Sequence, residues 1–377
     1  MKIKINPETE KIAYREDASM IRGNAEKIFL PETISELQEI VKQEGKITIR
    51  GAGTGLVGGA VPQNDAVVDL SKMKKIISID KKEKEAVVEA GVVLAELNRE
   101  LEKYNLEFPV NPSSYEVCTI GGMIATNAVG ARAWKYGRTA DWVKEIEVVK
   151  ADGESERIGK LGLSDFSGLE GISGIIVKAR LKLNERKTRT AKLLKLKEIN
   201  EVTSVVEKLK TLNDVSMIEF VDKLAGETIG LEESYYLLIE FESDRGELKG
   251  EEYQETLKKR DRVYPELASQ GYSHIEDPKI LLPKFSLLAE WLEAREIPFF
   301  GHISVGIIHP CFNSEQLKYI DEMMKYVKKL NGQISGEHGI GLAKKKYVDE
   351  ADKKVLKRIK DRYDSGRKFN AGKVVEI

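Results

Sequence analysis

The first part of the chain alternates between helical and extended patterns of apolar residues. In the stretch PETISELQEIVKQEGKITIR, apolar residues recur every three or four positions, which predicts an amphipathic helix. Thr33 and Glu36 form the capping box expected at its start. Residues 46–50 then alternate as a short strand, and the apolar run 66–70 predicts a second strand. A loop rich in glycine lies between the two strands.

This loop, GAGTGLVGGA, matches neither of the common nucleotide-binding loops. A Rossmann fingerprint needs a glycine where Leu56 stands, and a helix directly afterwards. A Walker loop needs Lys and then Ser or Thr after its last glycine, whereas Gly58 is followed by Gly59 and Ala60. Five glycines within nine residues do allow positive φ angles and a nest of N–H groups that binds an anion. A flexible surface loop is the alternative.

Two further segments concentrate small residues. The first, NPSSYEVCTIGGMIATNAVG, places glycine or alanine at five positions around Asn127. Such a segment packs its backbone against a flat or bulky ligand, because large side chains would fill the same space. The second, FSGLEGISGIIVKARLKL, repeats the glycine pattern and ends in a strand-like alternation.

The middle of the chain predicts a separate small sheet. VTSVVEKLKTLNDVSMIEFVD has the pattern of a helix followed by a strand, and ESYYLLIEFESD has that of another strand. These elements suffice for a small antiparallel sheet with helices.

Two of the four histidines, His302 and His309, lie in the apolar stretch FFGHISVGIIHPCF. An unbroken strand would point side chains seven positions apart to opposite faces. A helix would align them, but the β-branched residues and glycine between them disfavour a helix. A break at Gly306 would let both rings converge. Two unrelated structural histidines are the alternative from this stretch alone.

A second motif, SGEHGIG, adds a carboxylate. Glu337 and His338 are adjacent and are bracketed by Gly336 and Gly339. Because adjacent side chains of an extended chain diverge, one of them is expected to bind a metal while the other faces a substrate. Two imidazoles and one carboxylate form a ligand set that suits Zn²⁺, Mn²⁺ or Fe²⁺.

Composition narrows the class of protein. A chain of 377 residues suggests two domains. With 61 Lys and Arg against 62 Asp and Glu, the net charge is -1, so the composition lacks the excess of positive charge typical of proteins that bind nucleic acid. No apolar run approaches the ~18 residues of a membrane-spanning helix, and the mixed-charge start does not predict a signal peptide. Two cysteines, Cys118 and Cys311, cannot hold an iron–sulfur cluster, and we expect buried thiols in a reducing cytoplasm.

The three glycine segments, in their order and spacing, resemble the FAD-binding domain of the vanillyl-alcohol oxidase/p-cresol methylhydroxylase superfamily. More narrowly, residues 22–374 resemble the FAD-linked D-2-hydroxy acid dehydrogenases. That family includes D-lactate dehydrogenases, the glycolate oxidase FAD subunit and D-2-hydroxyglutarate dehydrogenase. The resemblance is patchy over residues 188–277 and clear at the histidine motifs.

The resemblance implies an α+β fold in which a two-subdomain FAD-binding fold of the p-cresol methylhydroxylase type carries a small cap domain with an antiparallel sheet and helices. The expected divisions are an FAD-binding domain over 1–187 and a substrate or cap domain over 188–310. The remaining segment, 311–377, carries the EHG motif and returns to the FAD domain.

The resemblance also assigns candidate residues. Those expected at the FAD pyrophosphate are Gly51, Ala52, Gly53, Thr54, Gly55 and Leu56. Those expected beside the isoalloxazine and ribityl chain, or elsewhere near the flavin, are Pro112, Ser113, Thr119, Gly121, Gly122, Asn127, Glu170, Gly171, Ile176 and Asn370. Members with covalent flavin often use a histidine in the first loop, where this chain has Thr54, so non-covalent FAD is expected.

For the histidine motifs the resemblance implies metal ligands at His302, His309 and Glu337, with His338 as the general base. The metal would polarise the hydroxyl of a small 2-hydroxy acid while hydride passes from its Cα to FAD. Arg260 resembles an arginine that would clamp the substrate carboxylate as a bidentate fork, with a solvated arginine on a charged helix as the alternative.

The chain departs from the family pattern around these ligands. Val305 and Ile307 replace an aspartate and an asparagine, Cys311 replaces another asparagine, and Phe285 replaces a small hydroxyl residue. Apolar replacements around an intact triad predict a small or apolar substrate, lactate- or glycolate-like, instead of a dicarboxylic acid. A decayed site is the alternative.

The electrons would leave to a separate carrier, such as a quinone, electron-transferring flavoprotein or an iron–sulfur subunit. A homo-oligomer or a larger redox complex is compatible with the sequence, as is peripheral contact with a membrane. A non-catalytic flavin-binding subunit is the alternative function, and a metal-dependent hydrolase on an unrelated fold is a more distant one.

Overall fold

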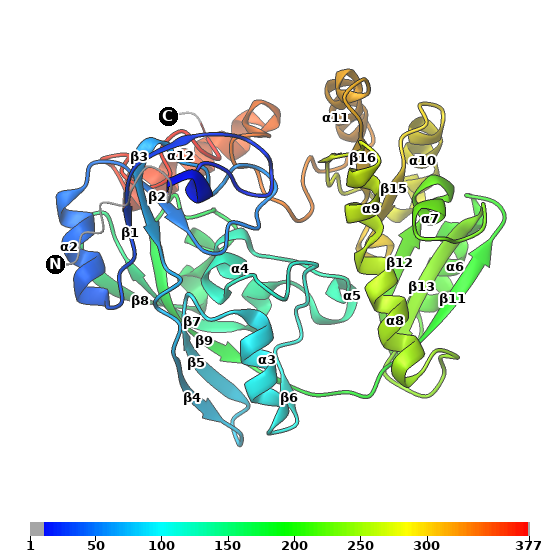
Figure 1. The fold of residues 1–377 in the computed structure, drawn as a ribbon, viewed down its shortest axis with the longest axis horizontal. Coiled ribbons are helices and arrows are strands. Elements are labelled where there is room, and N and C mark those ends of the chain that lie inside the picture. Colours follow the sequence, from blue (N-terminus) through cyan, green and yellow to red (C-terminus); the bar gives the residue numbers. More distant parts are fainter. Residues whose placement is uncertain (1–10, 376–377) are drawn as a thin grey trace. The chain divides into compact units, whose positions relative to one another are not determined.

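The computed structural model describes residues 11–375, and these form two compact units. The first unit contains the described parts of 1–128, 138–186 and 338–377. The second contains 129–137 and 187–337. Figure 1 shows the ribbon of both units, coloured along the sequence.

The N-terminal part of the first unit is a three-stranded parallel sheet of order β1-β3-β2. Its strands are β1 (Asn24–Phe29), β2 (Ile47–Arg50) and β3 (Gln63–Asp69), and the helix α2 (Ile34–Gln43) connects the first two. Thr33 caps α2 by accepting a hydrogen bond from the Glu36 N–H, as the capping pattern predicts. Leu37, Ile40 and Val41 of α2 are buried in the core of this sheet.

The other layer of the first unit is a five-stranded antiparallel sheet of order β4-β5-β9-β7-β8. Its strands are β4 (Ile76–Asp80), β5 (Glu85–Glu89), β7 (Val143–Val149), β8 (Ser155–Gly159) and β9 (Ile175–Lys182). Helices α3 (Leu94–Glu102) and α4 (Ile120–Thr126) contribute to its core, which also holds Cys118. A two-stranded pair joins β6 (Leu106–Glu107) to β10 (Asn184–Glu185).

The chain returns to the first unit at its C-terminal end. Helix α12 (Glu350–Tyr363) is followed by a parallel bridge between Phe369 and Ile47 of β2. Lys360 of α12 is buried, and its ammonium group donates to the Ile172 carbonyl and pairs with Asp364. The bridge attaches the C-terminal segment to the parallel sheet, and Lys360 attaches α12 to the segment that precedes β9.

The second unit is built on a six-stranded sheet of order β11-β13-β12-β15-β16-β14 in which every pairing is antiparallel. Its strands are β11 (Thr190–Leu196), β12 (Val215–Val221), β13 (Tyr235–Phe241), β14 (His274–Ile275), β15 (Phe299–Gly301) and β16 (His309–Phe312). The central strand β12 is buried along its whole length.

Helices complete the second unit, and Figure 1 shows α8 and α9 following one another along the sheet. The helices are α5 (Ala133–Tyr136), α6 (Glu201–Lys210), α7 (Lys223–Thr228), α8 (Gly250–Asp261), α9 (Val263–Ser269), α10 (Phe285–Glu293) and α11 (Ile320–Lys329). The helix and two strands predicted between residues 202 and 244 are α6, β12 and β13. The antiparallel cap sheet with helices is therefore present.

The units divide the chain differently from the sequence-based boundaries. We expected the cap domain to end at residue 310, but the second unit continues to Glu337. The strand β16 crosses residue 310, and α11 follows it, so a division there would cut through the sheet. The short segment 129–137 also belongs to the second unit, because Arg132 forms a two-pronged ion pair with Glu240 of β13.

Both cysteines are buried free thiols, as expected. Within residues 11–375, no helix combines the length and apolar character needed to cross a bilayer.

Candidate active site

His302 and His309 converge because the strand that carries them is interrupted. The strand β15 ends at Gly301, a 3₁₀ turn spans Ile303–Val305, and β16 begins at His309. Gly306 ends the turn with a φ of 74°, and a Cβ on it would lie 2.0 Å from the Ile280 carbonyl oxygen. Only glycine fits this position, and the resulting kink places the two imidazole centroids 5.3 Å apart at 88°.

Glu337 joins the two histidines to complete a cluster of three metal-type ligands. The ligand atoms of His302, His309 and Glu337 all lie within 4.8 Å of one another. Oε2 of Glu337 is 3.1 Å from Nε2 of His302 and 3.7 Å from Nε2 of His309. Both histidines are buried, so this donor set fits a divalent cation in a mostly dry site.

Asp277 holds the turn that carries Glu337. Its buried carboxylate oxygen Oδ2 accepts hydrogen bonds from the backbone N–H groups of Gly336 and Glu337 and from the Ser335 hydroxyl. Asp277 was not expected at the site, because the EDP segment that contains it has the composition of an ordinary loop. The structure brings it beside a turn 58 to 60 residues further along the chain.

Glu219 of β12 is a second residue that the sequence analysis missed. Its oxygen Oε1 lies 2.6 Å from Nδ1 of His302, and both side chains are buried. Burial raises the pKa of the Glu219 carboxyl, but the charges of Arg260 and His302 outweigh this and lower the pKa overall. Burial lowers the pKa of His302, yet Glu219 and Glu337 raise it to about 9. A charged residue inside the apolar run SMIEFV was the available signal.

Arg260 of α8 lies against Glu219. Its Nε and Nη2 groups donate to Oε2 of Glu219 at 2.9 and 2.5 Å, and Nη1 donates to Asp261. The fork expected to clamp a substrate carboxylate is therefore engaged with a carboxylate of the protein itself. Arg260 is therefore not a solvated surface arginine, and its expected role as a substrate clamp stays a prediction.

His338 belongs to the first unit, because the division between the two units falls between Glu337 and His338. Its side chain is half-buried. The fourth histidine, His274, lies in β14 with its ring Nε2 3.0 Å from Glu276, and it is not a member of the ligand cluster.

The glycine loop follows β2 in the first unit and approaches the start of α4. Gly53 has a φ of 71°, and a Cβ on Gly51 would lie 2.6 Å from Oγ1 of Thr119. The segment 51–56 is partly exposed, with Ala52 the most open residue. The backbone of Gly51 therefore packs directly against the Thr119 side chain, which brings together two segments that the sequence assigns to the flavin.

The residues around α4 have defined backbone roles. Thr119 caps α4 by accepting from the Gly122 N–H, and Asn127 ends the helix in the left-handed conformation with φ of 48°. A Cβ on Gly121 would lie 2.6 Å from that of Ala90, so this glycine allows the helix to approach the neighbouring strand segment. These backbone contacts explain why Thr119, Gly121 and Asn127 occur at their positions, with no need to invoke a ligand.

Glu170, Gly171 and Asn370 form one polar cluster in the first unit. Glu170 is buried, and its Oε1 accepts from the backbone N–H groups of Ile340 and Gly341. Burial raises the pKa of this carboxyl. The Asn370 amide donates to the Glu170 carbonyl and accepts from the Ile49 N–H. Glu170 thereby fixes the backbone that directly follows the EHG motif.

Three other expected flavin residues lie apart from these clusters. Ile176 packs in the hydrophobic core of the five-stranded sheet, and only 5% of its surface is exposed. Pro112 is buried, and Ser113 lies in an exposed turn. The side chain of Ile176 therefore contributes to this core, and its expected place near the flavin stays a prediction.

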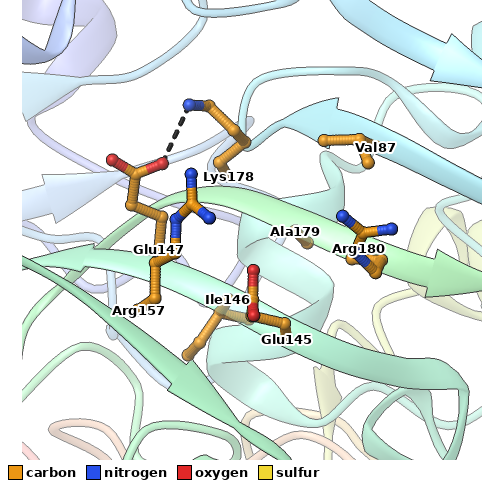
Figure 2. A pocket seen from close by; sticks show the side chains of 8 residues that line it. All are labelled: Val87, Glu145, Ile146, Glu147, Arg157, Lys178, Ala179 and Arg180. Atoms are coloured by element: carbon orange, nitrogen blue, oxygen red, sulfur yellow. Dashed lines mark hydrogen bonds and ion pairs between the residues drawn. The ribbon is translucent and has the colours of Figure 1, made fainter.

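A shallow pocket on the five-stranded sheet contains none of the candidate residues. Figure 2 shows its lining from β5, β7, β8 and β9, with the Glu147–Lys178 ion pair at one side. The lining residues are Val87, Glu145, Ile146, Glu147, Arg157, Lys178, Ala179 and Arg180. Their charges are mixed, and no histidine or cysteine is among them, so the candidate chemistry lies in the two clusters described above.

Two families of known protein domains match parts of the chain. Residues 25–159 match the FAD binding domain family, and residues 288–374 match the C-terminal domain of FAD linked oxidases. The chain is 27% identical to a D-lactate dehydrogenase of Archaeoglobus fulgidus, with 99% of this chain and 97% of that protein covered. It is 28% identical to glycolate oxidase subunit GlcD of Bacillus subtilis, with 97% and 92% covered.

A third relative is a D-2-hydroxyglutarate dehydrogenase of Stutzerimonas stutzeri, which is 26% identical over 92% of this chain and 90% of that protein. Among solved structures, an alkyldihydroxyacetonephosphate synthase shares the fold, with a TM-score of 0.72 at 15% identity over 98% of this chain and 82% of that one. The chain thus combines the two domains of an FAD-linked oxidoreductase, an FAD binding domain followed by the C-terminal domain of FAD linked oxidases.

Proposed function

We propose that this protein is an FAD-dependent, metal-assisted dehydrogenase that oxidises a small D-2-hydroxy acid, lactate- or glycolate-like, to the 2-oxo acid. The observation that carries the proposal is the convergence of His302, His309 and Glu337 into one buried ligand set. The names of the relatives support a hydroxy acid substrate.

The cofactors would supply a Lewis acid for the substrate oxygens and an acceptor for the hydride leaving Cα. The loop 51–56 offers backbone N–H groups to the FAD pyrophosphate, with the glycines giving close approach. Thr54 occupies the position where related proteins carry a flavin-linked histidine, which supports non-covalent FAD.

His302, His309 and Glu337 would hold the divalent cation through two imidazole nitrogens and one carboxylate oxygen. His338 would take the proton of the substrate hydroxyl, the role for which enzymes use imidazole most often. His302 directly follows β15 and His309 begins β16, while Asp277 fixes the backbone of the third ligand.

Apolar groups near the ligand set favour a small substrate. Ile307, which stands where the family has an asparagine, packs against Gly336: a Cβ on that glycine would lie 2.6 Å from Cγ1 of Ile307. A side chain that packs here cannot donate to a second carboxylate. A monocarboxylic acid therefore suits the site better than a dicarboxylic one.

An anaerobic absorbance titration tests the proposal. Purified protein supplied with Zn²⁺ or Mn²⁺ would be mixed with a panel of D- and L-2-hydroxy acids while the oxidised flavin spectrum is recorded. Bleaching by a D-monocarboxylic acid is the expected result. Acid precipitation should release the yellow colour into the supernatant, because the flavin is not covalently bound.

The alternative is a non-catalytic flavin-binding subunit of a larger redox complex. The apolar residues Val305 and Ile307 in the histidine motif favour it. A yellow protein that binds no divalent metal and is bleached by no acid would establish the alternative. A colourless protein after gentle purification would contradict both functions.

A further inference from the structure

The Glu219 carboxylate divides its two oxygens between two partners. Oε1 faces Nδ1 of His302 at 2.6 Å, and Oε2 receives both Nε and Nη2 of Arg260. All three side chains lie in the second unit, and no more than a tenth of any of them is exposed. The contacts form a linear chain from Arg260 through Glu219 to His302.

This chain determines which nitrogen of His302 is available to a metal. Nδ1 points to a carboxylate, which can only accept, so Nδ1 carries a proton. Nε2 faces the Glu337 carboxylate, so without metal it also donates a proton; it is the nitrogen in the ligand cluster, and a metal would bind it by displacing that proton. A metal-binding histidine is commonly oriented by such a hydrogen bond from its other nitrogen.

We propose that Glu219 is the positioning residue of the metal site and that Arg260 acts through Glu219. The inference rests on the proposed metal-binding role of His302. In this proposal Arg260 does not bind substrate. It donates two hydrogen bonds to Oε2 of Glu219, so that Oε1 of the same carboxylate is directed at His302. The ion pair also keeps Glu219 charged inside the sheet, where an unpaired carboxylate would be costly.

The arrangement requires a carboxylate, and an amide of the same shape cannot replace it. A glutamine would have one accepting oxygen for two donating partners. If its oxygen faced His302, its NH₂ group would oppose the Arg260 fork. If its oxygen faced Arg260, its NH₂ group would oppose Nδ1–H and favour the imidazole tautomer whose proton blocks Nε2.

The same sheet contains a matched control. Glu240 of β13 is buried and is gripped by Nε and Nη2 of Arg132 at 2.8 and 2.9 Å. Its other partners are Ser216, Tyr253 and, at 3.6 Å, Arg189, and it forms no contact with the three metal ligands. Glu240→Gln therefore breaks a comparable buried Arg–Glu pair away from the ligand cluster.

The first measurement is the Zn²⁺ affinity of wild type, Glu219→Gln and Glu240→Gln, determined by competition with a chromophoric chelator. We expect Glu219→Gln to bind Zn²⁺ about 10- to 100-fold more weakly. Glu240→Gln should keep the wild-type affinity even if it loses similar thermal stability. Equal weakening in both variants would assign Glu219 a general structural role and overturn the inference.

The second measurement does not depend on metal. With only four histidines, a spectrum of the [¹⁵N]histidine-labelled protein without metal contains four imidazole spin systems, and His302→Asn assigns one of them. The hydrogen-bonded Nδ1–H signal of His302 should be lost or shifted in Glu219→Gln and unchanged in Glu240→Gln. An unchanged signal in Glu219→Gln would overturn the inference even if that variant failed to bind Zn²⁺.

Arg260→Met provides a further variant in case Glu219→Gln folds poorly. It should weaken Zn²⁺ binding while Arg260→Lys restores part of the affinity, because lysine keeps the charge without the fork. If wild type itself binds no Zn²⁺, the proposed metal site fails. If wild type binds Zn²⁺ and Glu219→Gln binds it equally well, only the positioning role fails.

Discussion

Oδ2 of Asp277 lies 2.6 Å from the backbone nitrogen of Glu337, and the same oxygen receives the N–H of Gly336 and the hydroxyl of Ser335. This single buried oxygen therefore holds the backbone turn that carries Glu337, a candidate metal ligand. Removal of that atom should change the position of the Glu337 carboxylate without altering any ligand.

Asp277→Ala should destabilise the protein by about 3 kcal/mol, because it leaves buried N–H groups without an acceptor. Its Zn²⁺ affinity should fall about 10-fold, as expected for loss of an outer-shell partner. Urea denaturation and chelator competition measure the two effects. Ser335→Ala removes only one of the three donors and should cost about 1 kcal/mol. A Zn²⁺ affinity unchanged in Asp277→Ala would refute this role of the turn.

Gly306→Ala should destabilise the protein by more than the cost of a positive φ alone, because the added Cβ would also overlap a neighbouring carbonyl group. The φ of Gly306 is 74°, and a Cβ there would lie 2.0 Å from the Ile280 carbonyl. Gly230 is the control, since its φ is 78° and nothing lies within 4 Å of the added carbon.

Gly230→Ala should cost about 1–2 kcal/mol, the penalty of the left-handed conformation. Gly306→Ala should cost about 3 kcal/mol or more, because the steric overlap adds to that penalty. Denaturant unfolding measures both, and Zn²⁺ binding should weaken only in Gly306→Ala. An equal loss of unfolding free energy in the two variants would show that the backbone near Ile280 moves to accommodate the added Cβ without cost.

Added Zn²⁺ should stabilise the protein through the ligand cluster. A ligand that binds only the folded state at ~100 times its Kd contributes about 2.7 kcal/mol. This gain should disappear in His309→Ala and persist in His274→Ala, because His274 lies outside the cluster. Unfolding with and without Zn²⁺ is the measurement. A gain kept by His309→Ala would place the stabilising ion at another site.

Asp222 should make stability depend on pH. It is buried at the start of α7, where it accepts a hydrogen bond from the Ala225 N–H, and burial raises its pKa to about 8. The folded state therefore holds a proton that the unfolded chain releases above its ordinary pKa of 3.8. The stabilising contribution is present at low pH and is lost as the pH rises toward 8.

Asp222→Asn keeps the hydrogen-bond acceptor and removes the titration. Relative to wild type, its free energy of unfolding should increase by about 1.4 kcal/mol per pH unit over the range where only the folded state is protonated. Urea denaturation at about pH 5, 6, 7 and 8 gives this difference. Glu232→Gln, at a fully exposed position, serves as the surface control. A difference independent of pH would contradict a raised pKa at Asp222.

Local patterns in the sequence predicted the elements of the first unit well. The helix over α2, its Thr33 cap and the strands on either side of the glycine loop all follow from apolar spacing and capping chemistry. Gly306 was also identified as a break, since a glycine between two histidines is a local signal. The structure gives it the left-handed conformation that makes the break.

The partners of Glu219 and Asp277 could not be found in this way. The hydrogen bond between Glu219 and His302 spans 83 residues, and the one between Asp277 and Glu337 spans 60. No periodicity or spacing encodes such partners. Arg260 illustrates the same difficulty, because the carboxylate it grips comes from β12, 41 residues earlier in the chain.

The pairing of β12 with β15 has a consequence for the order of folding. Phe220 pairs with Gly301 and Val221 with Phe300, so Glu219 and His302 stand next to the end of this antiparallel ladder. Their meeting closes a loop of 83 residues and must await formation of the central sheet. Contacts that form this late act on the unfolding rate more than on the folding rate. Bound Zn²⁺ would therefore slow the unfolding of the cap sheet and leave its folding rate almost unchanged.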